Sequence, residues 1–315
     1  PFDINSTNNA SGNWTIDYSG KNREANVTNG ATIFWSNVNG SDGKGAYDFD
    51  GNDSDSIKIT NFPTNISNGL TIVTWIKPRS INSKWHVIFG ACDPNLYFAI
   101  HTTNVPFVSY RNTALTQKTL AGVGALVANR WYHVAATFHP NSTVNIYVNG
   151  QPNASQTGGD GMNTAITATQ NIGNWNTQCG LPYWAKFNGT IDDMSFYNMS
   201  LTGAQVLALY NNRTDLIDSS MTETGETWNA TITPNDGNSS GTTGNTTALT
   251  ILANGVPTHG TPILNSTSGT NLTTENLTVY NITTADADGN AVKNIYNWYR
   301  NNTPIMVLNM PFENR

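Results

Sequence analysis

Charged side chains are scarce in this sequence. They make up 11% of its 315 residues, and the formal net charge at pH 7 is −6, whereas about a quarter of the residues of an ordinary soluble domain are charged. No cluster of Lys and Arg is present that could neutralise nucleic-acid phosphates. No apolar run approaches the roughly 18 residues of a transmembrane helix. The sequence therefore predicts no nucleic-acid partner and no membrane span, and a secretion signal or anchor is expected outside these residues.

Cysteine is equally scarce. Cys92 and Cys179 are the only two, so no second pair is available for a zinc site. In an oxidising environment we expect them to form a disulfide, and closing a loop of this length would stabilise the fold by about 4 kcal/mol. The alternative is a pair of buried thiols.

Asn-x-Ser/Thr, the acceptor sequence for N-linked glycans, is abundant. With 46 Asn and 64 Ser or Thr in the chain, chance predicts about 9 such sites. The sequence has 20, at Asn5, Asn9, Asn13, Asn26, Asn39, Asn52, Asn65, Asn141, Asn153, Asn188, Asn198, Asn212, Asn229, Asn238, Asn245, Asn265, Asn271, Asn276, Asn281 and Asn301. The alternative is compositional drift toward Asn and Thr. The excess predicts an extracellular or cell-surface protein that carries N-linked glycans.

Short alternating runs separated by Gly, Asn and Pro fill the middle of the chain, a pattern typical of an antiparallel β-sandwich. Asn149 and Gly150 predict a type I′ hairpin turn, because both residues tolerate a positive φ. One helix is predicted at residues 201–210, with Thr202 as N-cap and Gln205 in the position that completes a capping box. Strands are predicted at residues 46–49, 56–60, 70–77, 85–90, 96–102, 105–111, 131–139, 143–149 and 190–198.

Four segments carry a family resemblance in the right order. They are AYDFDGNDSDSIKI (46–59), LTIVTWIKP (70–78), the hairpin RWYHVAATF with VNIYVNG (130–150), and FNGTIDDMSFYNMSLTGAQVLALY (187–210). Together they resemble the opening strands, the central tryptophan strand, the hairpin, and the closing strand with terminal helix of the laminin-G-like family of concanavalin A-like folds. The resemblance implies an all-β jelly-roll β-sandwich over residues 1–213.

The remainder resembles an immunoglobulin-like domain of microbial surface proteins in inverted order. Residues 214–255 look like its C-terminal half, and residues 256–310 like its N-terminal half. Residues 311–315 echo the start of the chain, since Pro311-Phe312-Glu313 resembles Pro1-Phe2-Asp3. We therefore expect a jelly roll inserted in a split immunoglobulin-like repeat, whose last strands complete a neighbouring copy. The alternative is a circularly permuted sandwich whose two halves pair within one chain.

This organisation predicts function. Unpaired β edges in residues 256–310 would accept strands from another chain, and a head-to-tail contact of that kind builds a filament. The first hypothesis is a structural subunit or tandem repeat of a glycosylated surface filament or stalk whose partners are copies of itself. The alternative is a calcium-dependent adhesin module that binds carbohydrate.

Candidate binding residues follow from both the resemblance and the chemistry. The family often carries calcium near its loops, and Asp53, Asp55, Asp192 and Asp193 are the carboxylates in that neighbourhood; turn formation is the alternative role. Aromatic side chains in a Gly- and Asn-rich stretch could stack on carbohydrate, or pack around a disulfide: Trp175, Tyr183 and Trp184. Trp75 and Trp131 lie within predicted strands and are expected in the core. The run Asp286, Asp288 and Asn290 lacks the distal Glu of an EF-hand and predicts a turn.

No catalytic residues are predicted. Glycoside hydrolases with this fold need two carboxylates, but residues 1–213 contain a single Glu, Glu24. Asp192 and Asp193 are adjacent on a predicted strand and should point to opposite faces. His133 and His139 are expected to be hydrogen-bonded or on the surface. Glycoside hydrolysis therefore remains only a residual alternative.

Overall fold

The computed structural model describes residues 14–15, 17–19, 21, 23, 25–28, 33–36, 39–51, 56–62, 66–81, 84–90, 96–158, 161–163, 169–174, 186–235 and 240–308. The chain divides into two compact units. The first unit consists of Pro1–Thr222 and Asn229–Thr247, and the second of Glu223–Trp228 and Ala248–Arg315. Each unit is described separately below.

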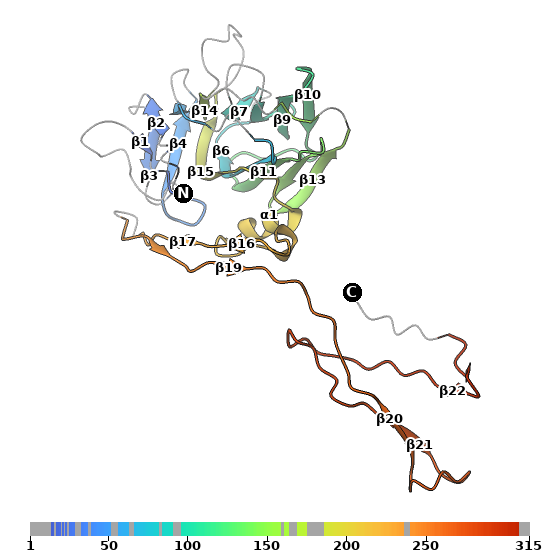
Figure 1. Ribbon diagram of the computed structural model, residues 1–315. Coiled ribbons are helices and arrows are strands. Elements are labelled where there is room, and N and C mark those ends of the chain that lie inside the picture. The colour runs from blue at the N-terminus through green and yellow to red at the C-terminus, as the bar shows by residue number, and fades with distance from the viewer. Residues whose placement is uncertain are drawn as a thin grey trace. The chain divides into compact units, whose positions relative to one another are not determined.

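Two antiparallel sheets build the first unit (Figure 1). The eight-stranded sheet has the order β1-β2-β5-β14-β7-β8-β9-β10, and the seven-stranded sheet has the order β13-β12-β11-β6-β15-β4-β3. The eight-stranded sheet consists of β1 (Trp14–Thr15), β2 (Ala25–Thr28), β5 (Ser56–Ile59), β14 (Gln170–Ile172), β7 (His86–Gly90), β8 (Leu96–Ile100), β9 (Pro106–Arg111) and β10 (Gln117–Ala121). The seven-stranded sheet consists of β13 (Gln151–Gln156), β12 (Val144–Val148), β11 (Tyr132–Phe138), β6 (Leu70–Pro78), β15 (Asn188–Tyr197), β4 (Ala46–Asp50) and β3 (Ile33–Ser36).

The main core lies between these sheets because apolar side chains alternate along the strands. On β6, Leu70, Ile72 and Ile76 belong to the main cluster, while Val73 belongs to a second cluster on the opposite face. That second cluster includes Val206 of α1 (Gly203–Tyr210), so the helix packs on the outer face of the seven-stranded sheet. The predicted all-β jelly-roll sandwich is confirmed.

The predicted hairpin turn is also confirmed. Asn149 and Gly150 have φ values of 51° and 73°, and they join β12 to β13 with Val148 opposite Gln151. A Cβ atom on Gly150 would lie 2.9 Å from both Leu207 and Tyr210 of α1. This glycine therefore provides the positive φ and also lets the helix approach the turn.

The helix is confirmed, but its predicted capping box forms only in part. The Thr202 hydroxyl accepts a hydrogen bond from the Gln205 backbone N–H at 3.3 Å. The Gln205 side chain does not return to Thr202. Its Nε2 donates to the Leu216 carbonyl at 2.9 Å, and its Oε1 accepts from the Asp218 N–H at 2.6 Å. The buried amide thus fastens the segment after the helix.

All nine predicted strands are present, with ends shifted by up to two residues. The prediction missed β1, β2, β3, β10, β13 and β14. Two of the missed strands, β10 and β13, are sheet edges with polar sequences. Hydrogen bonds to the backbone of the neighbouring strand stabilise such edge strands. Pro152 is tolerated in β13 because an edge strand pairs on one side only and needs fewer backbone donors. None of the described helices is long and apolar enough to cross a membrane.

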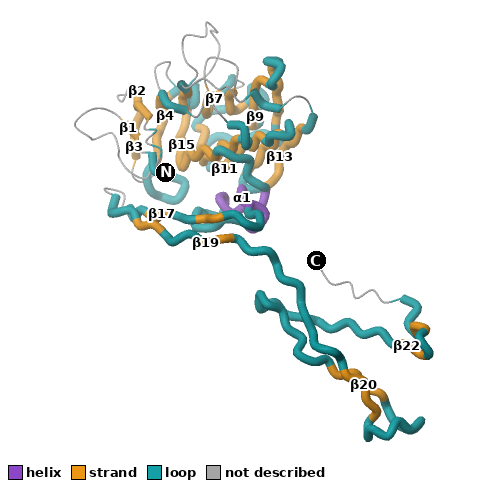
Figure 2. Tube along the Cα trace, viewed as in Figure 1, coloured by secondary structure: helices purple, strands orange, loops and turns teal. Residues whose placement is uncertain are grey.

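The second unit consists of short pairings. These join β16 (Thr227–Trp228) to β19 (Leu249–Thr250), β20 (Ile263–Ser266) to β21 (Leu277–Tyr280), and β22 (Tyr299–Arg300) to β23 (Thr303–Pro304). Figure 2 shows long loop segments between them. Within its described part, this unit has no sheet of more than two strands. The immunoglobulin-like halves therefore stay a prediction. The similar pair β17 (Thr231–Ile232) and β18 (Gly244–Asn245) belongs to the first unit.

Candidate functional site

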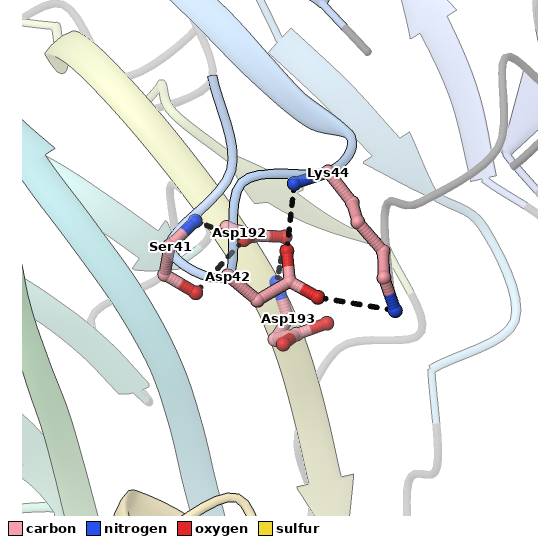
Figure 3. Close-up of polar contacts among 5 residues, drawn as sticks. All are labelled: Ser41, Asp42, Lys44, Asp192 and Asp193. Atoms are coloured by element: carbon pink, nitrogen blue, oxygen red, sulfur yellow. Dashed lines mark hydrogen bonds and ion pairs between the residues drawn. The ribbon is translucent and has the colours of Figure 1, made fainter. Parts of the chain in front are cut away.

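Asp192 is a fully buried carboxylate at the centre of one candidate site (Figure 3). Its Oδ2 accepts hydrogen bonds from the Ser41 N–H at 2.8 Å and from the Ser41 hydroxyl at 3.0 Å. Its Oδ1 accepts from the Asp193 N–H at 2.8 Å. Buried carboxylates need such donors to offset the loss of water. Asp192 therefore ties the loop at residues 39–45 to β15.

Asp193 departs from the regular strand that the sequence predicted. The pairing of β15 with β6 shifts between Asp192 and Ser195, and Asp193 has a φ of 48°. This is a β-bulge, a device that redirects side chains. The expectation that Asp192 and Asp193 face opposite sides of a regular strand is therefore wrong. Asp193 lines a pocket on the outer face of the sheet.

The fit of a calcium ion to this loop can be judged from its oxygens. A Cβ atom on Gly40 would lie within 3.0 Å of Asp192 Oδ2 and of the carbonyl oxygens of Lys44 and Gly45. Calcium takes about six to eight oxygens, and no group of three or more His, Cys, Asp and Glu side chains in the described part of the chain could hold a metal. The described residues alone do not complete a calcium site, and the calcium site stays a prediction.

Several predicted residues lie outside the described residues. They are Asp53 and Asp55 for calcium, Trp175, Tyr183 and Trp184 for carbohydrate, and Cys92 and Cys179 for the disulfide. Among the glycosylation residues, the same holds for Asn5, Asn9, Asn13, Asn52, Asn65 and Asn238. The other glycosylation residues are exposed or half-buried. Their occupancy by glycans stays a prediction.

The run at Asp286 forms the predicted turn. Asp286 Oδ1 accepts hydrogen bonds from the backbone N–H groups of Asp288 at 2.8 Å and Asn290 at 3.4 Å. Gly289 has a φ of 78°. The carboxylate therefore stabilises a bend of the backbone.

The outer face of the seven-stranded sheet carries a pocket with a volume of ≈ 570 Å³. Trp75 and His133 lie on its floor, on the neighbouring strands β6 and β11. The expectation that Trp75 is a core residue is wrong, because the core-facing positions of β6 are the alternate ones. Trp131 is also half-buried outside the core, with the Lys77 ammonium 5.9 Å from its ring centroid. We call this hollow the outer pocket.

His133 and His139 differ in their hydrogen bonding. His139 Nε2 lies 3.2 Å from the Asn145 amide, which confirms a satisfied histidine there. His133 is 1% exposed, yet its Nδ1 has no hydrogen-bond partner. Burial lowers the pKa of His133 from 6.5 to about 4. The expectation of a satisfied or surface residue at 133 is therefore wrong.

An aromatic cluster on the outer face of the eight-stranded sheet was missed by the sequence predictions. Trp85 lies 4.5 Å from His101 and 4.8 Å from Phe107, measured between ring centroids. Tyr97 lies 6.0 Å from Phe107. Tyr97 lies on β8 and His101 directly after it, an even number of residues apart, so the alternation of a strand places both side chains on one face. That spacing was the signal in the sequence that could have found the cluster. We call these four residues the aromatic cluster.

The second unit contains a groove lined by three of its segments. Residues 257–264 and 279–284 line one part, and residues 292–299 line the other, around a volume of about 580 Å³. Leu264, Val279 and Ile295 give it an apolar character. We call it the C-terminal groove.

Comparison with known proteins gives the family and the fold. Residues 50–207 match the family model described as the concanavalin A-like lectin/glucanases superfamily. The fold is similar to the botulinum neurotoxin serotype G binding domain, with 16% identity and a TM-score of 0.50 over 63% of this chain and 48% of that one. The chain thus spans about half the length of that domain. No curated protein matches the chain in sequence.

A second solved structure is smaller. Domain 4 of AbnA, a GH43 extracellular arabinanase from Geobacillus stearothermophilus, was solved in complex with arabinotriose. It is 23% identical, with a TM-score of 0.45 over 57% of this chain and 82% of that one. At these identities, structural similarity describes the fold alone.

Proposed function

The chain belongs to the concanavalin A-like lectin/glucanases superfamily, and we propose that it is a non-catalytic structural subunit or tandem repeat of an extracellular, N-glycosylated surface filament or stalk. Successive units would share β-strands through the second unit. The observation that carries this proposal is the absence of a core in that unit: Ser266 is the only buried side chain among its described residues.

Large apolar side chains of the second unit are exposed to solvent. Isolated two-stranded hairpins are at best marginally stable in water, and apolar surface of this extent is uncommon on a monomer. Burying it against another chain would stabilise the unit by about 25 cal/mol per Å². The exposed residues are Leu249, Leu252, Val256, Ile263, Leu264, Leu272, Leu277, Tyr280, Ile295, Tyr296, Tyr299, Ile305, Met306, Val307 and Leu308.

The C-terminal groove is the surface we assign to strand sharing. Its β20–β21 hairpin has an unpaired backbone edge on each side, and such an edge accepts an added strand. Within the described part of this unit, no strand pairing joins residues 256–304 to residues 223–228 or 248–252. This supports pairing with a second copy over the alternative of a permuted sandwich within one chain. A groove on one copy filled by a different segment of the next copy gives a head-to-tail contact.

The test is the assembly state of the intact glycosylated chain. We expect light scattering to show concentration-dependent association, and electron microscopy to show linear assemblies. Leu264→Lys places a charge in the groove and should abolish association. Leu115→Lys, at an exposed leucine of the first unit, is the matched control and should assemble normally. A monomeric wild-type chain at high micromolar concentration would contradict the proposal.

A second candidate function is carbohydrate binding, for which the aromatic cluster is the supporting observation. Aromatic faces stack on sugar rings, and Trp85 is only half-buried. Calcium-dependent binding to a glycan array would support this role. Trp85→Ala should then weaken binding, and binding unaffected by that substitution would count against the cluster as the site. Hydrolysis is not proposed, since paired Glu residues are missing from residues 1–213.

A further inference from the structure

Asn254 and Gly255 form an Asn-Gly pair between β19 and β20 of the second unit. Such a pair can react with itself, because the glycine nitrogen can attack the side-chain amide carbon of the asparagine and close an imide ring. Glycine has no Cβ atom to hinder that approach. The surrounding groups decide whether the pair reacts in a folded chain, since they hold and activate the reacting atoms.

The nitrogen of this glycine contacts a carboxylate. The Gly255 N–H donates a hydrogen bond to Asp288 Oδ2, and a Cβ atom on Gly255 would lie 3.0 Å from that oxygen. Asp286 holds Asp288 in place, because its Oδ1 accepts from the Asp288 N–H at 2.8 Å. A carboxylate in this position can act as a general base that removes the proton as the nitrogen attacks.

The side-chain amide of Asn254 is held at both of its ends. Its Oδ1 accepts a hydrogen bond from Asn290 Nδ2 at 3.2 Å. Its Nδ2 donates to the Gly255 carbonyl oxygen at 2.9 Å, which keeps the amide beside the glycine. A donor at Oδ1 stabilises the negative charge that develops there when a nucleophile adds to the amide carbon. The base and this donor come from the same turn, at residues 286–290.

Other Asn-Gly pairs of the chain have different surroundings. The N–H groups of Gly40 and Gly69 donate to backbone carbonyl oxygens at 2.8 Å and 2.9 Å, and a carbonyl is a far weaker base than a carboxylate. Asn149 Oδ1 accepts from the His133 N–H at 3.0 Å in the hairpin turn, and Asn188 begins β15. Regular backbone pairing fixes both of these asparagines, so they serve as internal references.

From the carboxylate at the Gly255 nitrogen and the amide donor at Asn254 Oδ1, we propose that Asn254 is a site of self-catalysed conversion to aspartate or isoaspartate. The Gly255 nitrogen forms a bond to Asn254 Cγ and gives its proton to Asp288. The Cγ–Nδ2 bond then breaks, and the amide nitrogen leaves as ammonia with that proton. Water opens the imide at either carbonyl and leaves a carboxyl group at position 254. The reaction consumes water alone.

The conversion would open the contact between the two segments of this site. An imide nitrogen carries no hydrogen, so Gly255 can no longer donate to Asp288 once the ring has closed. After hydrolysis a new carboxylate at position 254 faces Asp288, and like charges at short range repel. Val256 occupies the position where a glycosylation sequence needs Ser or Thr, so Asn254 is not a glycan acceptor. This inference does not depend on strand sharing.

The test follows the mass of one peptide from the intact glycosylated chain. The chain is aged at neutral pH in water enriched in heavy oxygen, and a protease that cuts after leucine then releases residues 253–264, which contain no glycosylation sequence. We expect this peptide to gain one labelled oxygen at least about ten times faster in the folded chain than in urea. Asn149 and Asn188 should react more slowly in the folded chain than in urea.

Variants assign the roles of the neighbouring side chains. Asp288→Ala should slow the conversion at least about tenfold because it removes the base, and Asp288→Glu should restore part of the rate. Asn290→Ala should slow it about two- to tenfold, the effect of one hydrogen bond. Glu275→Ala is the matched control, since it removes a carboxylate of the same unit that binds the hydroxyl groups of Ser268 and Thr270 instead. It should leave the rate unchanged.

Three results would each overturn the proposal. In the first, Asn254 keeps its amide while the reference pairs convert. In the second, Asn254 reacts no faster in the folded chain than in urea. In the third, Asp288→Ala and Asn290→Ala both react as fast as the wild type. A chain that stays monomeric in light scattering would contradict strand sharing and would leave this reaction unchanged, so the two failures can be told apart.

Discussion

His133 and Trp75 lie side by side on β11 and β6, with ring centroids 5.2 Å apart and ring planes inclined by 66°. The edge-to-face arrangement suits an uncharged imidazole packed against an indole. Because burial lowers the pKa of His133 to about 4, the folded chain takes up this proton only in acid. The unfolded chain takes it up near the usual value of 6.5.

The first prediction concerns pH. Between pH 6.5 and about 4, the unfolded state binds a proton at this site that the folded state does not, so stability falls as the pH falls. His133 lowers the free energy of unfolding by at most about 3 kcal/mol over this range. Burial also lowers the pKa of His86 and of His139. These two histidines therefore add to the loss of stability on acidification. Urea denaturation at a series of pH values measures the effect.

His133→Phe isolates the part that belongs to this residue. We expect the variant to lose stability less steeply on acidification. At neutral pH we expect it to be about 1 kcal/mol more stable than the wild type, because the substitution removes an unpartnered buried nitrogen. An unchanged pH profile would contradict the assignment to His133.

The second prediction concerns Asp192. Removing its carboxylate in Asp192→Ala leaves the donors of Ser41 and Asp193 without their acceptor. We expect a loss of about 2–4 kcal/mol in the free energy of unfolding. Asp42→Ala, at an exposed residue of the same loop, should cost less than about 1 kcal/mol. Chemical denaturation compares the two, and equal losses would show that Asp192 does not anchor the loop.

The same two variants test calcium. If Asp192 is a ligand, calcium raises the melting temperature of the wild type, chelation lowers it, and Asp192→Ala abolishes both responses. A wild-type melting temperature that is indifferent to calcium would contradict the predicted site. Asp42→Ala should respond to calcium as the wild type does.

The third prediction separates backbone conformation from packing at two glycines. Gly150 and Gly124 have similar φ values of 73° and 76°. A Cβ on Gly150 meets α1 at 2.9 Å, whereas a Cβ on Gly124 has nothing within 4 Å. Both alanine variants should lose about 1–2 kcal/mol to the left-handed backbone, and Gly150→Ala should lose about 1–3 kcal/mol more to overpacking. If thermal unfolding shows equal losses of stability for the two variants, then α1 moves away from the added Cβ at no cost in free energy.

The fold of the first unit could be predicted from the sequence wherever core residues alternate. Leu70, Ile72 and Ile76 mark β6 in this way, and Asn149-Gly150 marks the turn between β12 and β13 by backbone preference. The edge strands β10 and β13 could not be predicted, because their sequences are polar and their pairing comes from the neighbouring strand. Patterns within one segment predict a strand, but they do not predict what an edge will pair with.

The outer pocket could be predicted only in part. Val73 and Trp75 are two residues apart on β6, so alternation alone could have placed both side chains on the outward face. Its contact with His133, however, depends on the register between β6 and β11, and the position of Asp193 depends on a bulge. Register and bulges arise from tertiary pairing, and no local pattern in the sequence encodes them.

The last prediction concerns the second unit. Its described strands pair only in twos and bury almost nothing, so the backbone amides of residues 256–304 should exchange hydrogen rapidly in dilute solution. The amides of β6, which is buried on both faces, should be protected at every concentration. If copies share strands, raising the concentration slows exchange in residues 256–304 and leaves β6 unchanged.

Leu264→Lys should remove that concentration dependence, whereas Leu115→Lys should keep it. Strong protection of residues 256–304 at the lowest concentration would instead mean that the unit folds within its own chain, and strand sharing would have to be abandoned.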